Sequence, residues 1–171
     1  QKCVRCKPCD IMCGWGGAGA FSDGKVTLTT EYGGWLDEYL PKAEVLKLIH
    51  YADDQYVKYG GPQKIYGDDR LDEIRQLKQR SAAADLQLIP ARIRHLGTDN
   101  AYKILKAMSD DLAPRAEIRT MTTVEEIIPG KDGAPHKVIL QGGEELSGKY
   151  LIAAPGREGA EWFRGQATKL K

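Results

Sequence analysis

The fold class is decided near the C-terminus, by the stretch Lys149-Tyr150-Leu151-Ile152-Ala153-Ala154. This stretch is almost entirely apolar, which is typical of a strand buried on both faces of a parallel sheet. The residues before it alternate between apolar and polar with a period of about two. The alternation predicts strands at 116–121, 124–128 and 136–140, with turns at 131–133 and 142–143. We therefore expect α/β or α+β architecture.

The middle of the chain has apolar residues at helical spacing. A first helix is expected to begin at Pro41, which needs no N–H at that position, and to stop at Gly60-Gly61-Pro62. Further helices are expected over 68–84 and 100–112, and a short one in the tail 157–171. Residues 85–90 alternate and end in a proline, which predicts a short strand.

Composition excludes several classes of protein. The chain has 171 residues, 42% hydrophobic and 29% charged, with a formal net charge of +1. These values are typical of a folded globular protein and unlike those of a disordered one. The charge balance disfavours nucleic acid as a partner, and no apolar run approaches the roughly 20 residues that span a bilayer. We expect a cytoplasmic protein without membrane partners. Because residue 1 is Gln, we also expect a fragment or a processed chain.

The four cysteines follow the pattern Cys3-x2-Cys6-x2-Cys9-x3-Cys13. This is the spacing with which bacterial ferredoxins hold iron–sulfur clusters, although Gly14 stands where that pattern has proline. Four thiolates also form a valid zinc shell, although the usual zinc pattern separates two ligand pairs by a longer loop. The third interpretation is reactive thiols or a redox disulfide without a metal. All three remain open at this point.

A glycine-rich tract follows at once, with five glycines between Gly14 and Gly24. Such a backbone can approach a ligand closely and present N–H groups to phosphate or carbonyl oxygens. It is neither a Walker loop nor a clean dinucleotide fingerprint, since no strand precedes it and no clear helix follows. A flexible loop is the simpler interpretation, in which Asp23 only caps a turn and Lys25 is a solvated loop end.

His95 is the candidate for proton transfer, with Asp99 available to orient it. The alternative is that Thr98 or Asp99 caps the helix expected from residue 100. His50 and His136 are expected to be structural.

Several blocks resemble a largely uncharacterised bacterial family of FAD-dependent dehydrogenases. They are Lys7–Asp10 and Gly17–Lys25, then Gly33–Leu36, Arg94–Asp99 and Ala154–Trp162, in the order and spacing of that family across nearly the whole chain.

The resemblance implies a partial FAD/NAD(P)-binding, Rossmann-like domain with a mainly helical inserted subdomain. Its parts would be the cysteine- and glycine-rich loop 1–34, the helical insertion 35–112, and a hairpin with an inner strand of the FAD domain at 113–171. The family's main pyrophosphate loop would lie upstream of residue 1.

The resemblance also implies the site residues. Lys25 and His95 would be catalytic, and NAD(P) could serve as electron donor or acceptor. Contacts with FAD would come from Gly16, Gly17, Gly19, Ser22, Asp23, Gly24, Ala154 and Gly156.

We therefore expect part of an FAD-dependent oxidoreductase that acts on an unknown small molecule. A [4Fe-4S] cluster on Cys3, Cys6, Cys9 and Cys13 is one option for its electron transfer. The alternatives are a non-catalytic metal-binding or redox-sensing module built on the four cysteines, or a scaffold without a cofactor.

Overall fold

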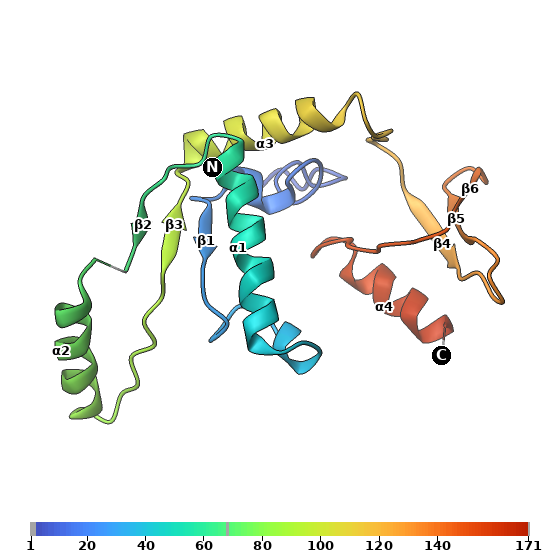
Figure 1. Cartoon of the computed structure of the whole chain (residues 1–171). Coiled ribbons are helices and arrows are strands. Elements are labelled where there is room, and N and C mark those ends of the chain that lie inside the picture. The colour runs from blue at the N-terminus through green and yellow to red at the C-terminus, as the bar shows by residue number, and fades with distance from the viewer. Residues whose placement is uncertain (1–2, 68, 171) are drawn as a thin grey trace. The chain divides into compact units, whose positions relative to one another are not determined.

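The computed structural model describes residues 3–67 and 69–170 and has a mixed α/β fold. The chain divides into two compact units, one formed by Ala18–Leu112 and the other by Gln1–Gly17 with Ala113–Lys171. The helices and the two small sheets are drawn in Figure 1. Both described sheets are three-stranded and antiparallel throughout.

The sheet of the unit Ala18–Leu112 has the order β1-β3-β2. Its strands are β1 (Lys25–Thr27), β2 (Ile65–Tyr66) and β3 (Ile93–His95). Lys25 pairs with His95 and Val26 with Arg94, and Ile65 faces Arg94 from the other side. The central strand therefore joins segments that lie about 70 and 30 residues away in the sequence. None of these three strands was predicted.

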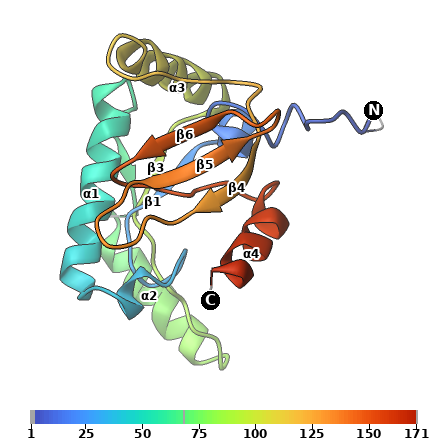
Figure 2. The ribbon, with the colours of Figure 1, turned by 90° about the vertical axis from the view of Figure 1, so that its right-hand side faces the viewer.

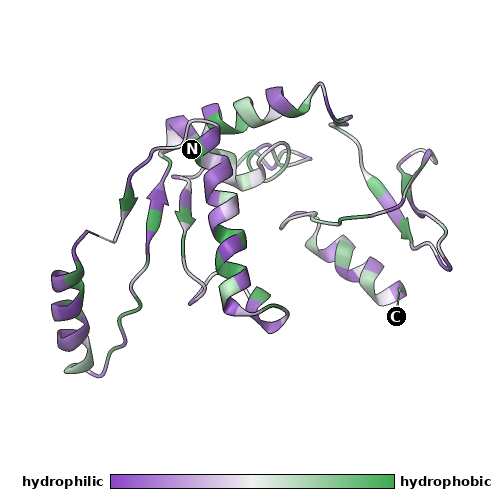
Figure 3. Cartoon of the chain, viewed as in Figure 1, coloured by the Kyte–Doolittle hydropathy of each residue, from purple (hydrophilic) through white to green (hydrophobic). Residues whose placement is uncertain are grey.

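Helix α1 (Lys42–Lys58) follows Pro41 as expected, and its end is closed by a hydrogen-bonded glycine pair. Gly60, with a φ of 103°, donates its N–H to Val57 O, and the Gly61 N–H reaches Tyr56 O at 2.8 Å. A Cβ on Gly61 would lie 2.7 Å from that same oxygen, so only glycine fits there. Green and purple alternate along α1 in Figure 3, as an amphipathic helix requires.

Two more helices complete this unit. Helix α2 (Leu71–Ala82) begins later than predicted, and the expected first residue, Asp68, lies outside the described residues. Helix α3 (Thr98–Leu112) begins two residues earlier than predicted. Short 3-10 turns lie at η1 (Gly17–Phe21) and η2 (Leu36–Glu38). The buried apolar side chains of the unit are Leu28, Val45, Leu96, Ala101 and Ile104.

A buried ion pair fastens α1 to β3. The guanidinium of Arg94 donates to both carboxylate oxygens of Asp53, over 2.6 and 2.8 Å, and also to Pro62 O. Both charged side chains are almost fully buried. Their hydrogen bonds compensate for the water that each group gives up.

The other unit contains the meander β4 (Val124–Ile128), β5 (His136–Leu140) and β6 (Glu145–Gly148), followed by α4 (Ala160–Lys169). Figure 2 shows the three strands side by side. The β4–β5 register shifts between Val124 and Glu126, which leaves the Glu125 carbonyl outside the ladder. That carbonyl accepts hydrogen bonds from Trp162 Nε1 and Gln166 Nε2 of α4.

The strands 124–128 and 136–140, their turns and the tail helix are as predicted, but two expected strands are wrong. Residues 85–90 form no strand: Asp85 has a φ of 53° at the end of α2, and Leu86 and Ile89 are exposed. Residues 116–121 also lack a ladder, because Met121 takes a φ of 52° and the segment is solvated. Alternation alone gives no partner strand, and neither segment has one among the described residues.

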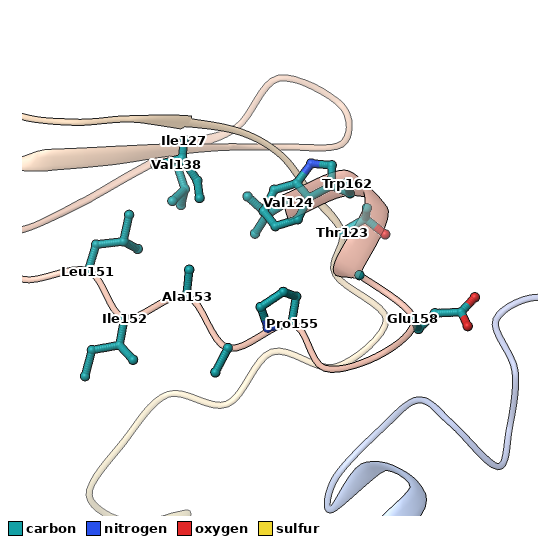
Figure 4. Close-up of a pocket in the computed structure, with 12 residues that line it drawn as sticks. Thr123, Val124, Ile127, Val138, Leu151, Ile152, Ala153, Pro155, Glu158 and Trp162 are labelled. Carbon is teal, nitrogen blue, oxygen red and sulfur yellow. The ribbon is translucent and has the colours of Figure 1, made fainter. Parts of the chain in front are cut away.

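The decisive stretch 149–154 is extended but belongs to neither described sheet. Tyr150 and Ile152 are 80% and 89% exposed, so the predicted burial on both faces is wrong for the described residues. A strand that is apolar on both faces needs a layer on each side. Here only the side that carries Leu151 and Ala153 faces other apolar side chains (Figure 4).

Among the described residues, no helix combines the length and the apolar character that crossing a bilayer requires.

Candidate functional site

The pairing of β1 with β3 brings the two expected catalytic residues together. Lys25 and His95 are directly opposite each other in the antiparallel register, so their side chains leave the same face of the sheet. The loop before β1 is fastened to the chain after β3, because Leu96 N donates to Gly24 O and Gly97 N to Asp23 O. Residues that are about 70 positions apart thus form one cluster.

The carboxylate of Asp23 is the centre of this cluster. Its Oδ1 accepts a hydrogen bond of 3.0 Å from the hydroxyl of Thr98, the first residue of α3. Its Oδ2 lies 3.6 Å from Lys25 Nζ and 3.9 Å from His95 Nε2. We name Asp23, Lys25, His95 and Thr98 the carboxylate cluster.

These neighbours set the charge of the carboxylate. The hydrogen bond from Thr98 lowers the pKa of Asp23 below its ordinary value of 3.8, and the nearby charge of Lys25 lowers it further. Asp23 is more than half exposed, so solvent screens these effects. The carboxylate is nevertheless ionised at any pH near neutrality.

His95 has one nitrogen without a partner. The Nε2 atom is inaccessible to solvent and makes no hydrogen bond. Its distance of 3.9 Å to Asp23 Oδ2 is too long for one. The rest of the imidazole is partly exposed. A base with an unused nitrogen next to a carboxylate is an arrangement suited to proton transfer.

Ser22 and Gly24 shape the loop that presents Asp23. The Ser22 hydroxyl donates to Gly19 O over 3.0 Å and accepts the Gly24 N–H over 3.1 Å. Gly24 has a φ of 61°, and a Cβ there would lie 2.8 Å from Leu96 Cβ. Both residues were expected to contact a cofactor, and in the structure both have a local structural role.

The other expected cofactor residues lie elsewhere in the chain. Gly16 precedes η1, and Gly17 and Gly19 lie within it. A Cβ on Gly19 or on Gly156 would meet no atom within 4 Å, so the backbone is open at both positions.

Ala154 lines an apolar pocket of about 550 Å³ in the unit that contains α4. Figure 4 shows Leu151 and Ala153 pointing across the pocket toward Ile127 and Val138, with Trp162 at one end. This volume lies in the range of about 300–1,000 Å³ that small-molecule pockets occupy. The walls suit a flat apolar ring.

The four cysteines are described, and each is a free thiol. Cys3 Sγ accepts the N–H of Arg5 and Cys6 Sγ that of Asp10, each over 3.4 Å, and the Cys13 N–H bonds Cys9 O within one turn. Within 3–67 and 69–170, no three His, Cys, Asp or Glu side chains are grouped as a metal shell would need. Iron–sulfur and zinc binding therefore stay predictions.

Sequence reasoning missed the role of Thr98, which was expected only as a helix cap. It also missed the neighbours of Lys25 on β1. The alternation Lys25-Val26-Thr27-Leu28 is a strand signal, but it was too short to stand out beside the glycine tract.

Comparisons with known protein families, with curated proteins and with solved structures found no match to this chain.

Proposed function

We propose that this chain is part of a cytoplasmic, bacterial FAD-dependent oxidoreductase that transfers a hydride or electrons between a small molecule and the flavin. The observation that carries the proposal is the carboxylate cluster, in which strand pairing brings Lys25 next to His95. The two residues come from separate blocks of sequence, and each is a candidate for catalysis independently of the other. NAD(P) is the proposed partner in the other half-reaction.

Each residue of the carboxylate cluster has a chemical task in this proposal. Bound FAD would supply the redox chemistry, and the protein would supply orientation and proton handling. His95 would take or give a proton at Nε2. The Asp23 carboxylate, held by the Thr98 hydroxyl, would stabilise the imidazolium that results. The ammonium of Lys25 would polarise a carbonyl of the substrate or of the flavin.

The residues present fit part of a flavin. The pocket beside Ala154 is lined mostly by apolar side chains, and the open backbone at Gly156, in the same unit, leaves room for close approach. In such proteins a strand followed by Gly-x-Gly-x-x-Gly supplies the main pyrophosphate site. Gly14, Gly16 and Gly19 have that spacing, but no strand precedes them among the described residues. We therefore expect weak binding of FAD by these residues alone.

An anaerobic absorption spectrum tests the proposal. The spectrum of the purified chain is recorded alone, after equilibrium dialysis against FAD and after dithionite, and bound flavin is measured as the excess over the dialysate. A reducible flavin spectrum that stays with the protein is the expected result. Lys25→Met and His95→Gln should then slow reduction of the flavin by NADPH, and the control His50→Gln should not. A protein that retains no flavin overturns the proposal for this chain.

The second candidate is a metal-binding or redox-sensing module built on the four cysteines. The two N–H to Sγ hydrogen bonds favour it, because such bonds stabilise thiolates. It predicts a bound metal and no flavin. In the same spectrum, a broad shoulder that bleaches on reduction would indicate an iron–sulfur cluster, and a Cys9→Ser variant should lose it. A colourless chain with stoichiometric zinc would indicate a structural zinc site.

A further inference from the structure

A second pocket, of about 410 Å³, lies within the unit Ala18–Leu112. It is formed by β1, the loop 29–34, η2 and the first half of α1. The residues used below are Lys25, Thr27, Leu36, Asp37, Val45 and Ile49, all of which line it. We name it the β1 pocket.

The β1 pocket carries one positive and one negative side chain. Asp37 has no ion pair or hydrogen bond through its carboxylate within the described part of the chain. Lys25 is 3.6 Å from Asp23, but this pair is well exposed and an ammonium has three donors. Both charges therefore remain available to a ligand.

One further ion pair lies beside the β1 pocket. Lys42 Nζ lies 3.5 Å from Glu31 Oε1, and the two belong to the start of α1 and the adjoining loop. In the lining itself, the charged residues are Lys25 and Asp37.

Three aliphatic residues give the β1 pocket an apolar patch, and threonine, tyrosine and glycine residues form the rest of its uncharged lining. Val45 is buried on α1, Ile49 follows it one turn later, and Leu36 comes from η2. Thr27 adds a hydroxyl two residues after Lys25, on the same face of β1. The pocket thus combines opposite charges, a hydroxyl and an aliphatic surface.

We propose that the β1 pocket binds a free α-amino acid with an aliphatic side chain. Its carboxylate would bind Lys25 and the Thr27 hydroxyl, its ammonium would bind Asp37, and its side chain would pack on Leu36, Val45 and Ile49. A ligand without a carboxylate would make no charged contact with Lys25, and one without an ammonium would leave Asp37 without a counter-charge. The binding site itself does not depend on the proposed function. The identification of the bound amino acid as the substrate does rest on that function, because Lys25 also belongs to the carboxylate cluster.

The test is calorimetric titration of the full chain, without flavin, with leucine as the probe. Two analogues each lack one charge: 4-methylpentanoate has no ammonium, and 3-methylbutylamine has no carboxylate. We expect leucine to bind at least about tenfold more tightly than either analogue. Equal affinity for leucine and an analogue would overturn the proposal, as would the absence of saturable leucine binding up to about 10 mM.

Substitutions in the β1 pocket show whether leucine binds there. Asp37→Asn and Lys25→Met should each weaken leucine binding by about tenfold or more, and Lys25→Arg should weaken it less. Asp85→Asn and Lys47→Met remove the same charges from exposed positions of the same unit and should change the affinity by less than about twofold. If the controls weaken binding as much as the pocket variants do, leucine binds elsewhere. Failure of the flavin experiment leaves these outcomes unchanged, so the two proposals fail separately.

Discussion

At the scale of single residues, Asp23 determines how the carboxylate cluster is held. It is the one residue of the cluster whose side chain reaches β1, β3 and α3 together, through Lys25, His95 and Thr98. Of these three contacts, the one with the Thr98 hydroxyl is the shortest. The position of the carboxylate between the two nitrogen groups therefore depends on a residue outside either strand.

Replacement of Thr98 by valine should raise the pKa of Asp23 toward its ordinary value, because the hydrogen bond from Thr98 is the largest cause of its depression. A depressed carboxyl pKa stabilises the folded state above the unfolded-state pKa, and this stabilisation is lost as the pH falls through the folded-state value. Thr98→Val should reduce that contribution at neutral pH. A carbon-detected NMR titration of the Asp23 carboxyl, from about pH 2 to 6, measures the shift directly.

Thr98→Ser is the matched control, since it keeps the hydroxyl and should keep the low pKa. If Thr98→Val leaves the Asp23 titration unchanged, the hydrogen bond does not hold the carboxylate in solution.

The sequence offered Lys25 and His95 as candidates but did not predict that they are opposite each other in a sheet. Each residue was selected from its local sequence, Lys25 because it follows the glycine-rich tract and His95 because it precedes an expected helix. Their contact depends on the register of two three-residue strands far apart in the sequence. Such short strands give almost no periodic signal, and tertiary packing decides their pairing.

At the scale of elements, the helices and the local hairpin were predictable, and the non-local strands were not. Helix α1 has a proline at its start and a glycine pair at its end, and β4 and β5 are joined by a turn with Asp132-Gly133. These signals are local. The segments 85–90 and 116–121 alternate just as well, yet have no partner strand among the described residues, which no local pattern reveals.

Asp53→Asn should detach α1 from β3, because it leaves the buried guanidinium of Arg94 without its counter-charge. The expected loss in the free energy of unfolding is about 3 kcal/mol or more. Urea unfolding followed by NMR at the methyl groups of Ile104, the most buried residue of this unit, measures it.

The neighbouring Asp54→Asn is the control, as Asp54 is exposed, and it should cost less than about 0.5 kcal/mol. Equal losses in the free energy of unfolding from Asp53→Asn and Asp54→Asn would mean that the buried ion pair of Asp53 with Arg94 contributes no more to stability than an exposed charge does.

At the scale of the whole molecule, the chain passes between its two units twice, after Gly17 and after Leu112, and an exposed segment follows the second passage. Helix α3 ends at Leu112, and β4 begins at Val124. The residues between them are solvated and belong to neither sheet. Length suggested one domain or slightly more, and the change from helical to alternating spacing placed the end of the expected helical insertion at residue 112.

Limited trypsin digestion should therefore cut early after Arg115 or Arg119, because the whole segment 113–123 is exposed and lies in no helix or ladder. Mass spectrometry of the early products identifies the cut. Arg115→Gln combined with Arg119→Gln should delay it. A first cut within α1 or β5 would show that this segment is not the least protected part of the chain.

The extended stretch Tyr150–Ala154 has a consequence for solubility. It is uncharged and exposes Tyr150 and Ile152, two residue types that favour strands. Exposed segments of this kind can stack into cross-β assemblies. Lys149 stands at one end and Pro155, which lacks an N–H, at the other. A charge and a proline in these positions act as gatekeepers, because each interrupts the stacking of strands from different molecules. At high protein concentration, the five residues between them are the segment through which different molecules would associate. Lys149 and Pro155 limit the extension of that association along the chain.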